Sequence, residues 1–572
     1  MGPPRWHDGV MLNFENTDVL LSEDQGDGPV PEDFLAEIAA TAVGCIIHDF
    51  PDEPGRTFRL VLRSLVDYPV KIDRVVASFL GEATMVLEHG WQSWSTVRRT
   101  RPLDVRPERA TAPRWFKHEM TTDGAAVGNT VLCDTFCLTD QFVLGALSEK
   151  TSFITFEVED GRVLANYLLE GLVLEPGQDL DLDTLWYADG KAGPNYSSYA
   201  AAAGLANDAR VDRGVPTGWC SWYQYFGNLN SVAISENAAL AAEHGLAVVQ
   251  IDDGWQRSIG EWDTTRPEFG EPIEDLAASI VRDGGVAGIW TAPFLAMEGS
   301  PLATKHPEWL LRHVDGRPVT ALVSNAWGGK SFALDTTNDE VLKHLEATYR
   351  DLANKGFEYF KIDFLFAAAI PGVRVGDGDV TRATALRLGL EAIRKGIGED
   401  AYLLGCGSPL LGAVGYVDAM RVSEDVAPFW QPEQFFEGFP ECTVAAQNAV
   451  EQSVLRAPLH RRWFLNDPDC ALLRPTDTRL TSEERLVLLR TIMGTGGYLI
   501  VSDDLSLYTG EEWDLLHQAM DAQEFADGTL DLVDPFAITQ TVKGPHFALK
   551  VNWALPSAQL LRRDGTEVLS AS

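Results

Sequence analysis

The sequence predicts a multidomain α/β protein, in which a central (β/α)8 TIM barrel follows an N-terminal β-sandwich domain and precedes a small C-terminal β-domain. The chain has 572 residues, which is too many for a single hydrophobic core. Period-two alternation fills the chain to about residue 190, and strand-like runs alternate with helical runs from residue 216. These shifts predict three domains, at residues 1–200, 201–525 and 526–572.

The two flanking parts of the chain both predict β-structure. Alternating apolar and polar residues at 57–66, 71–80 and 161–177 are typical of an antiparallel sandwich. Residues 195–210 then predict a helix that connects this part to the barrel. The end of the chain, from FADGTLDLVDPF onward, returns to short alternating strands and predicts a β-domain of about fifty residues packed on the barrel.

Strand-like runs alternate with helices in the central part, which indicates repeated βα units. The predicted strands are PTGWCSWYQ, LAVVQIDD, VAGIWTAPF, FEYFKIDFLF, AYLLGCGSPL, YVDAMRVSED, RWFLNDPDC and YLIVSDD. Between them, Asn338 is placed to cap a helix over 338–356, and Thr481 with Glu484 forms a capping-box pattern. A doubly wound sheet is the alternative, but it would usually carry a glycine-rich turn after its first strand, and GWCSWYQYF is no such turn.

Composition and charge restrict the possible partners. The formal net charge of -38 argues against nucleic acid and an anionic membrane surface. No apolar run approaches the roughly 20 residues that span a bilayer, and the N-terminus lacks the pattern of a secretion signal. The seven cysteines are sparse and odd in number, as in reduced cytoplasmic proteins, and Cys133 and Cys137 have no second pair to complete a metal site. We predict a cytoplasmic protein with a small-molecule ligand; a homo-oligomer remains open.

Polar and aromatic residues gather at the ends of the predicted strands, where a barrel carries its active site. They are Trp222 and Tyr223, Asp252 and Asp253, Trp290, Lys361 and Asp363, Cys406 and Ser408, Arg421 and Asp425, Asp467 and Asp469, and Asp503 and Asp504. A single acid at such a position is most often a helix cap or a turn former, as we expect for Asp503 and Asp504. The convergence of the whole set on one mouth favours a functional site.

The stretch FEYFKIDFLF, residues 357–366, carries two charges within an otherwise apolar strand. Strand alternation places Tyr359, Lys361, Asp363 and Leu365 on the inner face, and Phe360, Ile362, Phe364 and Phe366 on the face that packs on helices. We expect the Lys361 ammonium to lower the pKa of the Asp363 carboxyl, which suits a nucleophile. The alternative is a buried ion pair that only tightens the barrel core.

Two carboxylates that face an aromatic-walled pocket predict glycoside hydrolysis, with retention or inversion left open. Asp425 shares a face with Arg421 and supplies the second carboxylate. A purely structural role is the alternative for some single residues, since Cys406, Trp222 and Trp290 could all be core residues. A metal-dependent hydrolase would usually need a histidine pair such as H-x-H, which none of the eleven histidines forms. A non-catalytic sugar-binding protein is the third reading.

Seven motifs in fixed order resemble the α-galactosidases of glycoside hydrolase family 36, in the clan of retaining α-galactosidases. They are GWCSWYQYF, VVQIDDGW, GIWTAPF, YFKIDFLF, GCGSPLL, DAMRVSEDVAPFW and WFLNDPDC. WQSWS, residues 91–95, looks like the family's loop over the sugar. The resemblance implies a retaining, exo-acting enzyme that hydrolyses terminal α-linked galactose from raffinose- or melibiose-type oligosaccharides through a covalent glycosyl-aspartate.

The resemblance also implies residue roles. Asp363 would be the nucleophile and Asp425 the acid/base, while no metal or organic cofactor takes part. The implied sugar-binding residues are Asp252 and Asp253 at O4 and O6, the cations Lys361 and Arg421, Cys406 near O2, and the aromatic wall of Trp91, Trp222, Tyr223 and Trp290. Gln224 stands where related enzymes carry histidine, which leaves the aglycone preference open. An α-N-acetylgalactosaminidase, or another α-glycosidase or transglycosylase on the same scaffold, is the alternative.

Overall fold

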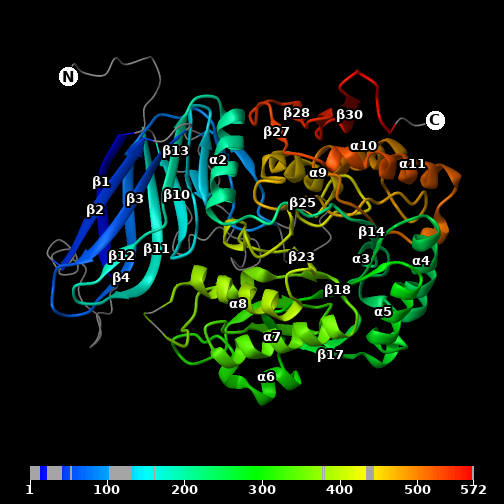
Figure 1. Cartoon of the computed structure of the whole chain (residues 1–572), viewed down its shortest axis with the longest axis horizontal. Coiled ribbons are helices and arrows are strands. Elements are labelled where there is room, and N and C mark those ends of the chain that lie inside the picture. Colours follow the sequence, from blue (N-terminus) through cyan, green and yellow to red (C-terminus); the bar gives the residue numbers. More distant parts are fainter. Residues whose placement is uncertain are drawn as a thin grey trace.

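The chain folds into two N-terminal antiparallel sheets, a central parallel sheet surrounded by helices, and a C-terminal antiparallel sheet (Figure 1). This computed structural model describes residues 13–21, 42–51, 55–101, 131–159, 161–376, 378, 380–432 and 444–569. The description below refers to those ranges.

The two N-terminal sheets lie as layers at one end of the molecule. One contains β1 (Asn13–Leu21), β4 (Val70–Leu80), β11 (Arg162–Leu174), β10 (Phe153–Glu159) and β7 (Val131–Asp134). The other contains β12 (Asp179–Asp181), β3 (Arg56–Ser64), β13 (Leu185–Asp189), β9 (Phe142–Ala146), β8 (Phe136–Thr139), β5 (Val86–Glu88) and β6 (Arg98–Thr100), with β2 (Val43–Pro51) also paired to β3. Phe58 of β3 packs against Phe79 of β4 with ring centroids 5.3 Å apart, so the apolar faces of the layers meet. The strands predicted at 57–66, 71–80 and 161–177 are confirmed as β3, β4 and β11.

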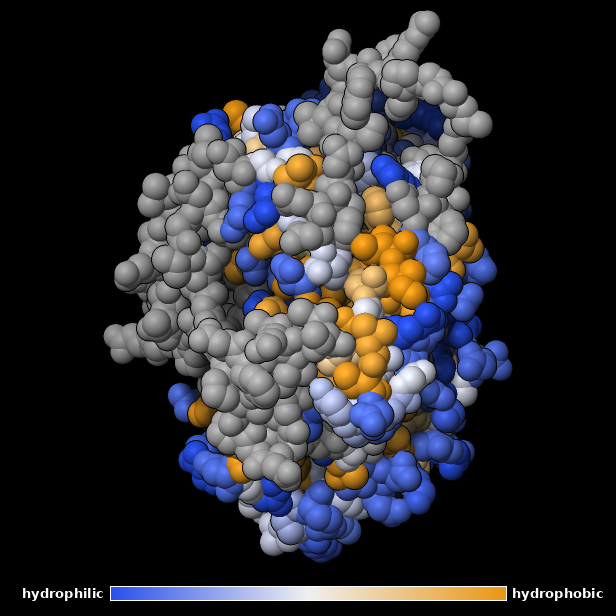
Figure 2. Space-filling model, turned by 90° about the vertical axis from the view of Figure 1, so that its left-hand side faces the viewer, coloured by the Kyte–Doolittle hydropathy of each residue, from blue (hydrophilic) through white to orange (hydrophobic). Residues whose placement is uncertain are grey.

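Figure 2 views the molecule from this end, where hydrophobic side chains are mixed with hydrophilic ones. The exposed large apolar side chains of these strands include Leu20, Ile46 and Leu80. The predicted connecting helix is α2 (Ala192–Ala206), which begins three residues earlier than expected from the pattern at 195–210. Its Tyr199 hydroxyl donates to the Ala146 carbonyl of β9 at 2.7 Å, which ties the helix to the second sheet.

The central sheet has eight parallel strands that curl into a TIM-like barrel. In sheet order they are β25 (Leu465–Asp467), β24 (Ala419–Arg421), β23 (Tyr402–Gly405), β22 (Tyr359–Ile362), β18 (Val286–Thr291), β15 (Val248–Ile251), β14 (Thr217–Cys220) and β26 (Leu499–Val501). Just beyond β25, Ala471 forms a parallel bridge with Val501, and its N–H donates to the Ile500 carbonyl at 2.7 Å. This bridge joins the two ends of the sheet. All eight predicted strands are therefore confirmed.

Helices cover the outside of this sheet (Figure 1). They are α3 (Trp222–Tyr225), α4 (Ser231–Glu243), α5 (Ile273–Arg282), α6 (Pro301–Lys305), α7 (Asp339–Asn354), α8 (Arg382–Ile397), α9 (Ala446–Leu455), α10 (Ser482–Gly494) and α11 (Gly510–Asp521). The predicted caps are confirmed, because Asn338 accepts from the Glu340 N–H and Thr481 forms a capping box with Glu484. In the described ranges, no helix combines the length and apolar character that crossing a bilayer requires.

Additional strands extend the barrel and follow it. Hairpin β16 (Gln256–Ser258) and β17 (Glu261–Thr265) follows β15, and a three-stranded sheet of β19 (Leu295–Met297), β21 (Gly329–Ala333) and β20 (Thr320–Ser324) lies between β18 and β22 in the chain. The C-terminal sheet contains β27 (Asp531–Leu532), β28 (Gln540–Lys543), β29 (Phe547–Asn552) and β30 (Ser557–Arg562). It packs on α10, where the buried Arg490 guanidinium donates to the Ala558 carbonyl at 2.7 Å.

Candidate active site

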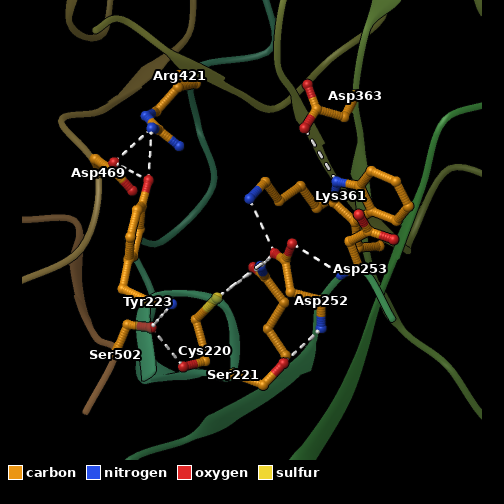
Figure 3. A network of polar contacts seen from close by, with 12 residues as sticks. Cys220, Ser221, Tyr223, Asp252, Asp253, Lys361, Asp363, Arg421, Asp469 and Ser502 are labelled. Atoms are coloured by element: carbon orange, nitrogen blue, oxygen red, sulfur yellow. Dashed lines mark hydrogen bonds and ion pairs between the residues drawn. The ribbon is translucent and has the colours of Figure 1, made fainter. Parts of the chain in front are cut away.

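The predicted polar residues meet at the carboxyl ends of the barrel strands. Figure 3 shows side chains from separate strands pointing toward one another, in two linked clusters. The first is centred on Asp252 after β15, and the second on Arg421 at the end of β24. Asp363, directly after β22, lies beside the Lys361 side chain that reaches into the first cluster.

Strand β22 ends at Ile362, so the alternation of inner and outer faces does not extend to the residues after it. Phe364 has a left-handed backbone (φ 54°, ψ 35°), and the 3-10 helix η4 (Leu365–Ala369) follows it. Phe360 faces outward as predicted and contacts Tyr349 of α7. The prediction that Phe364 packs on the barrel helices is wrong, because its ring contacts Trp94, Trp290 and Trp327. The strand has ended there, so period two no longer applies. Phe366 lies in η4, which packs on α8, and its ring also contacts Trp94.

Phe364 belongs to an aromatic group that surrounds Asp363. Its ring lies 5.1 Å from that of Trp94, 5.1 Å from that of Trp327 and 6.5 Å from that of Trp290, measured between centroids. Trp290 Nε1 donates to Asp363 Oδ2 at 3.0 Å, so this tryptophan is a polar partner as well as part of the wall. The backbone N–H of Phe364 donates to the other Asp363 oxygen at 2.7 Å.

The electrostatics of Asp363 differ from the prediction. Burial raises the pKa of Asp363 above its ordinary value, whereas Lys361, Trp290 and Cys406 act to lower it. We expected a lowered pKa because the sequence reveals the ammonium but not the depth at which the carboxyl is buried. Asp363 is 7% exposed, and desolvation outweighs the nearby charge.

Lys361 forms its ion pair with Asp252 and not with Asp363. The Lys361 Nζ lies 2.9 Å from Asp252 Oδ2, and Gln250 Nε2 donates to the same oxygen at 2.5 Å. Although burial acts to lower it, the surrounding anionic groups, above all Asp252, raise the pKa of Lys361 well above its usual range. The ammonium is therefore charged and is anchored on β15 beside the candidate nucleophile. The Ser221 hydroxyl completes this cluster, because its Oγ accepts from the Asp252 backbone N–H at 2.9 Å.

Asp253 is the second acid of the predicted pair, and it has separate partners. Gln256 Nε2 donates to one carboxylate oxygen at 2.6 Å, and Trp327 Nε1 donates to the other at 2.7 Å. Burial raises the pKa of Asp253 to about 6, against the effect of these two donors. Trp327 lies in the turn between β20 and β21, and the sequence analysis did not find it because this insertion has no strand-end pattern.

The second cluster joins two carboxylates through one guanidinium. Arg421 Nη2 contacts Asp425 Oδ1 at 2.7 Å and the Tyr223 hydroxyl at 3.0 Å, and it also donates to Asp469. Asp469 accepts from the Tyr223 hydroxyl and from the Val426 N–H, the latter at 2.7 Å. The Asp425 side chain is 37% exposed, whereas Asp469 is buried. Asp425 is thus the accessible acid of the pair.

Other predicted positions are less central. Cys406 is buried beside Asp363, and its thiol acts to lower the pKa of that carboxyl. Trp222 is half-buried and packs on Phe226, with ring centroids 5.2 Å apart. Asp503 is a structural group, as expected, because it accepts from the backbone of Leu473 at 2.6 Å and pairs with Arg474. In the described residues, no three His, Cys, Asp or Glu side chains are grouped as metal ligands.

The WQSWS loop of the N-terminal part reaches the barrel mouth within the same chain. Its Trp91 packs against Phe366, and the Ser93 N–H donates to the Ser408 carbonyl after β23 at 2.9 Å. The fully buried Arg456 guanidinium donates to the carbonyls of Ser93 at 2.6 Å and Ser95 at 2.7 Å. It also donates to the Val422 carbonyl after β24 at 2.8 Å. Arg456 therefore fastens this loop to the strand that carries Arg421.

Replacing Arg456 by methionine should lower the free energy of unfolding by roughly 2–4 kcal/mol, because several buried carbonyls lose their donor. Burial lowers the pKa of Arg456 to about 10, so the guanidinium is charged at neutral pH and its hydrogen bonds are charge-assisted. Urea unfolding followed by tryptophan fluorescence measures the loss. The exposed Arg563→Met variant is the control. Equal unfolding midpoints for the two variants would contradict the proposed fastening.

Comparisons with known proteins agree on one type of relative. A family model described as Melibiase matches residues 200–392. The α-galactosidase AgaA of Geobacillus stearothermophilus is 30% identical over 167 residues, which cover 28% of this chain and 22% of that protein. A protein of Flavonifractor plautii, described as an A type blood α-D-galactosamine galactosaminidase, is 27% identical over 157 residues, 26% of this chain and 14% of its own. The chain thus spans only a minor part of the length of these curated relatives.

Solved structures are similar to this chain over most of its length. The α-galactosidase TtGalA from Thermus thermophilus, in complex with p-nitrophenyl α-D-galactopyranoside, has a TM-score of 0.68 at 26% identity. The similarity covers 88% of this chain and 98% of that one. TtGalA has also been solved with stachyose.

Proposed function

We propose that this chain, which belongs to glycoside hydrolase family 36, is a retaining, exo-acting α-galactosidase that releases terminal α-linked galactose from oligosaccharides of the raffinose and melibiose type. The observation that carries the proposal is the pair of carboxylates at one barrel mouth. Asp363 is buried among aromatic rings, and the more exposed Asp425 is held by Arg421. We also propose that the curled sheet and its helices form a (β/α)8 barrel. The proposed domains remain residues 1–200, 201–525 and 526–572.

The proposed reaction uses the two carboxylates in turn. Asp363 attacks the anomeric carbon while Asp425 donates a proton to the departing glycosidic oxygen. A covalent galactosyl-aspartate results. Asp425 then takes a proton from water, the water oxygen attacks the anomeric carbon, and the bond to Asp363 breaks. Lys361, Trp290 and Cys406 favour the ionised form of Asp363, which the first step requires.

The remaining residues are proposed to bind the galactose hydroxyls and the ring. Asp252 and Asp253 would accept from O4 and O6, and Lys361 and Arg421 would donate to hydroxyl oxygens. Cys406 would lie near O2, and the tryptophan and tyrosine rings would contact the apolar face of the sugar. We assign the wall to Trp91, Trp222, Tyr223 and Trp290, and add Trp327. The mechanism uses no cofactor. We propose small α-galactosides as the substrates and the cytoplasm as the location, and the proposal is compatible with a homo-oligomer.

A galactosaminidase is the second candidate function, because the Flavonifractor plautii relative carries that description. Such an enzyme must accommodate an acetamido group where galactose has its 2-hydroxyl. Space near Cys406 would decide between the two sugars, and its thiol is buried against Asp363. A panel of 4-nitrophenyl α-glycosides, namely galactoside, N-acetylgalactosaminide and glucoside, tests the choice. The proposal requires the galactoside to have the highest kcat/KM, and preference for either other sugar would overturn it.

Replacing Trp327 by phenylalanine should move the acidic limb of the kcat/KM profile to higher pH by about half a unit. Trp327 lowers the pKa of Asp253, which is about 6, so loss of its N–H raises that pKa. As pH falls through this pKa, Asp253 becomes protonated and can no longer accept from the sugar as a carboxylate. KM should therefore rise near pH 6 while kcat changes less.

Trp309→Phe is the control for this variant, because Trp309 stacks on His306 and is not among the groups that act on Asp253. Activity measured between pH 4 and 8 with 4-nitrophenyl α-galactoside gives both profiles. An acidic limb that coincides with that of the wild type would show that Trp327 does not act through Asp253.

A further inference from the structure

One nitrogen of Arg421 serves three acceptors. Nη2 contacts Asp425, Asp469 and the Tyr223 hydroxyl, while Nε is buried without a hydrogen-bond partner. An NH2 group has two protons, so these acceptors compete for them. Asp425 and Asp469 thus share a single cation, and a change in the charge of one alters how strongly the cation acts on the other.

Several other titratable groups of the described residues act on this triad. The groups that act on Asp469 are Arg421, Asp425, Asp467, Lys361, Tyr223 and Cys470. Those that interact with Asp425 include Arg421, Asp469, Asp363, Tyr223 and Cys406. Among the cations in these sets, only Arg421 forms an ion pair with Asp425.

Asp469 has no role among the sequence predictions, yet its backbone conformation and its hydrogen bonds hold it firmly in the site. Its backbone has φ 80°, in the left-handed region that a non-glycine residue seldom adopts. In that conformation one carboxylate oxygen receives the Tyr223 hydroxyl, the Val426 N–H and Arg421. Burial raises the pKa of Asp469 to about 6, so at neutral pH it is ionised and can balance the guanidinium.

We propose that Asp469 is a positioning residue that maintains the protonated, acid form of Asp425 by taking up the charge of Arg421. The inference rests on the proposed function, because it gives Asp425 the role of acid. With Asp469 ionised, Arg421 is largely balanced and Asp425 can keep its proton. With a neutral side chain in its place, the full charge of Arg421 faces Asp425 and favours its ionised form, which cannot protonate a leaving group.

The test compares pH profiles for two substrates in the Asp469→Asn variant. Asparagine keeps the size and an acceptor oxygen but removes the charge. The alkaline limb of kcat/KM for melibiose should move to lower pH by about one unit, which corresponds to about a tenfold loss on that limb. The loss for 4-nitrophenyl α-galactoside should be much smaller, because nitrophenolate departs with little help from an acid.

Three further variants separate charge from structure. Asp469→Glu keeps the charge and should keep the wild-type limb. Asp503→Asn makes the same change at another buried, arginine-paired aspartate outside the site and should leave the limb in place. If Asp469→Asn does not fold, Asp469→Ser provides a second neutral variant.

The outcomes are distinct. A purely structural role predicts equal losses for both substrates at every pH, and that result, or an unmoved limb in Asp469→Asn, overturns the inference. A wild-type protein that cleaves neither galactoside overturns the proposed function instead. If the alkaline limb for melibiose shifts only in the variants with a neutral residue 469, the result supports both the inference and the proposed function.

Discussion

The Asp363→Ala variant is expected to lose roughly 10⁴-fold or more in kcat for 4-nitrophenyl α-galactoside while it remains folded. Asp363 is the carboxylate that receives Trp290 and the Phe364 N–H and lies beside Lys361. Without it, no group on the protein can form the covalent intermediate. Because the lost carboxylate was buried and destabilised by desolvation, its removal should cost the fold little. Circular dichroism and thermal unfolding measure that directly.

Sodium azide provides a positive test of this assignment. The space left by the carboxylate can admit azide, which would attack the anomeric carbon as nitrophenolate departs and form a carbon–nitrogen bond. Attack from the side of Asp363 gives β-galactosyl azide, the inverted product. Wild-type protein with azide is the control. Near wild-type turnover by Asp363→Ala, or an α-configured azide product from it, would remove Asp363 from the role of nucleophile.

Much of the fold could be predicted because its signals are local. The eight barrel strands each have an apolar run and a polar end, and the caps at Asn338 and Thr481 depend on neighbours two and three residues away. The end of β22 could not be predicted, because alternation continues in the letters beyond Ile362 while the backbone turns left-handed at Phe364. The inserted sheet of β19, β20 and β21 likewise interrupts the βα pattern without a sequence signal that marks it.

The candidate site was predictable where it follows from strand ends, and less so where it depends on distant contacts. Gln250 could have been found, since it lies in β15 two residues before Asp252, which follows the strand, and donates to it. Trp327 could not, because its bond to Asp253 spans 74 positions in the chain. The partner of Lys361 was also hidden, because alternation suggested Asp363 and only the packing of β22 near β15 favours Asp252.

Asp425→Ala should produce a loss that depends on the leaving group, unlike the loss in Asp363→Ala. Raffinose and melibiose have poor leaving groups that need a proton, so kcat/KM for them should fall by roughly 10³–10⁴-fold. For 4-nitrophenyl α-galactoside the first step needs little acid, and kcat/KM should fall far less. The second step still lacks a base, so the galactosyl-enzyme should accumulate and a burst of nitrophenolate should precede a slow steady state.

Azide distinguishes the two carboxylates through the anomer that it forms. In Asp425→Ala it needs no general base, so it should attack the galactosyl-Asp363 intermediate, raise the steady-state rate and give α-galactosyl azide, the retained product. The retained product arises because two successive inversions occur, one with Asp363 and one with azide. Equal losses for melibiose and the nitrophenyl substrate would contradict the acid role, and a β-configured azide from this variant would contradict the order of the two steps. The Asp425 side chain is 37% exposed and is positioned by its ion pair with Arg421. A leaving group, and then a water molecule, can therefore reach this carboxylate.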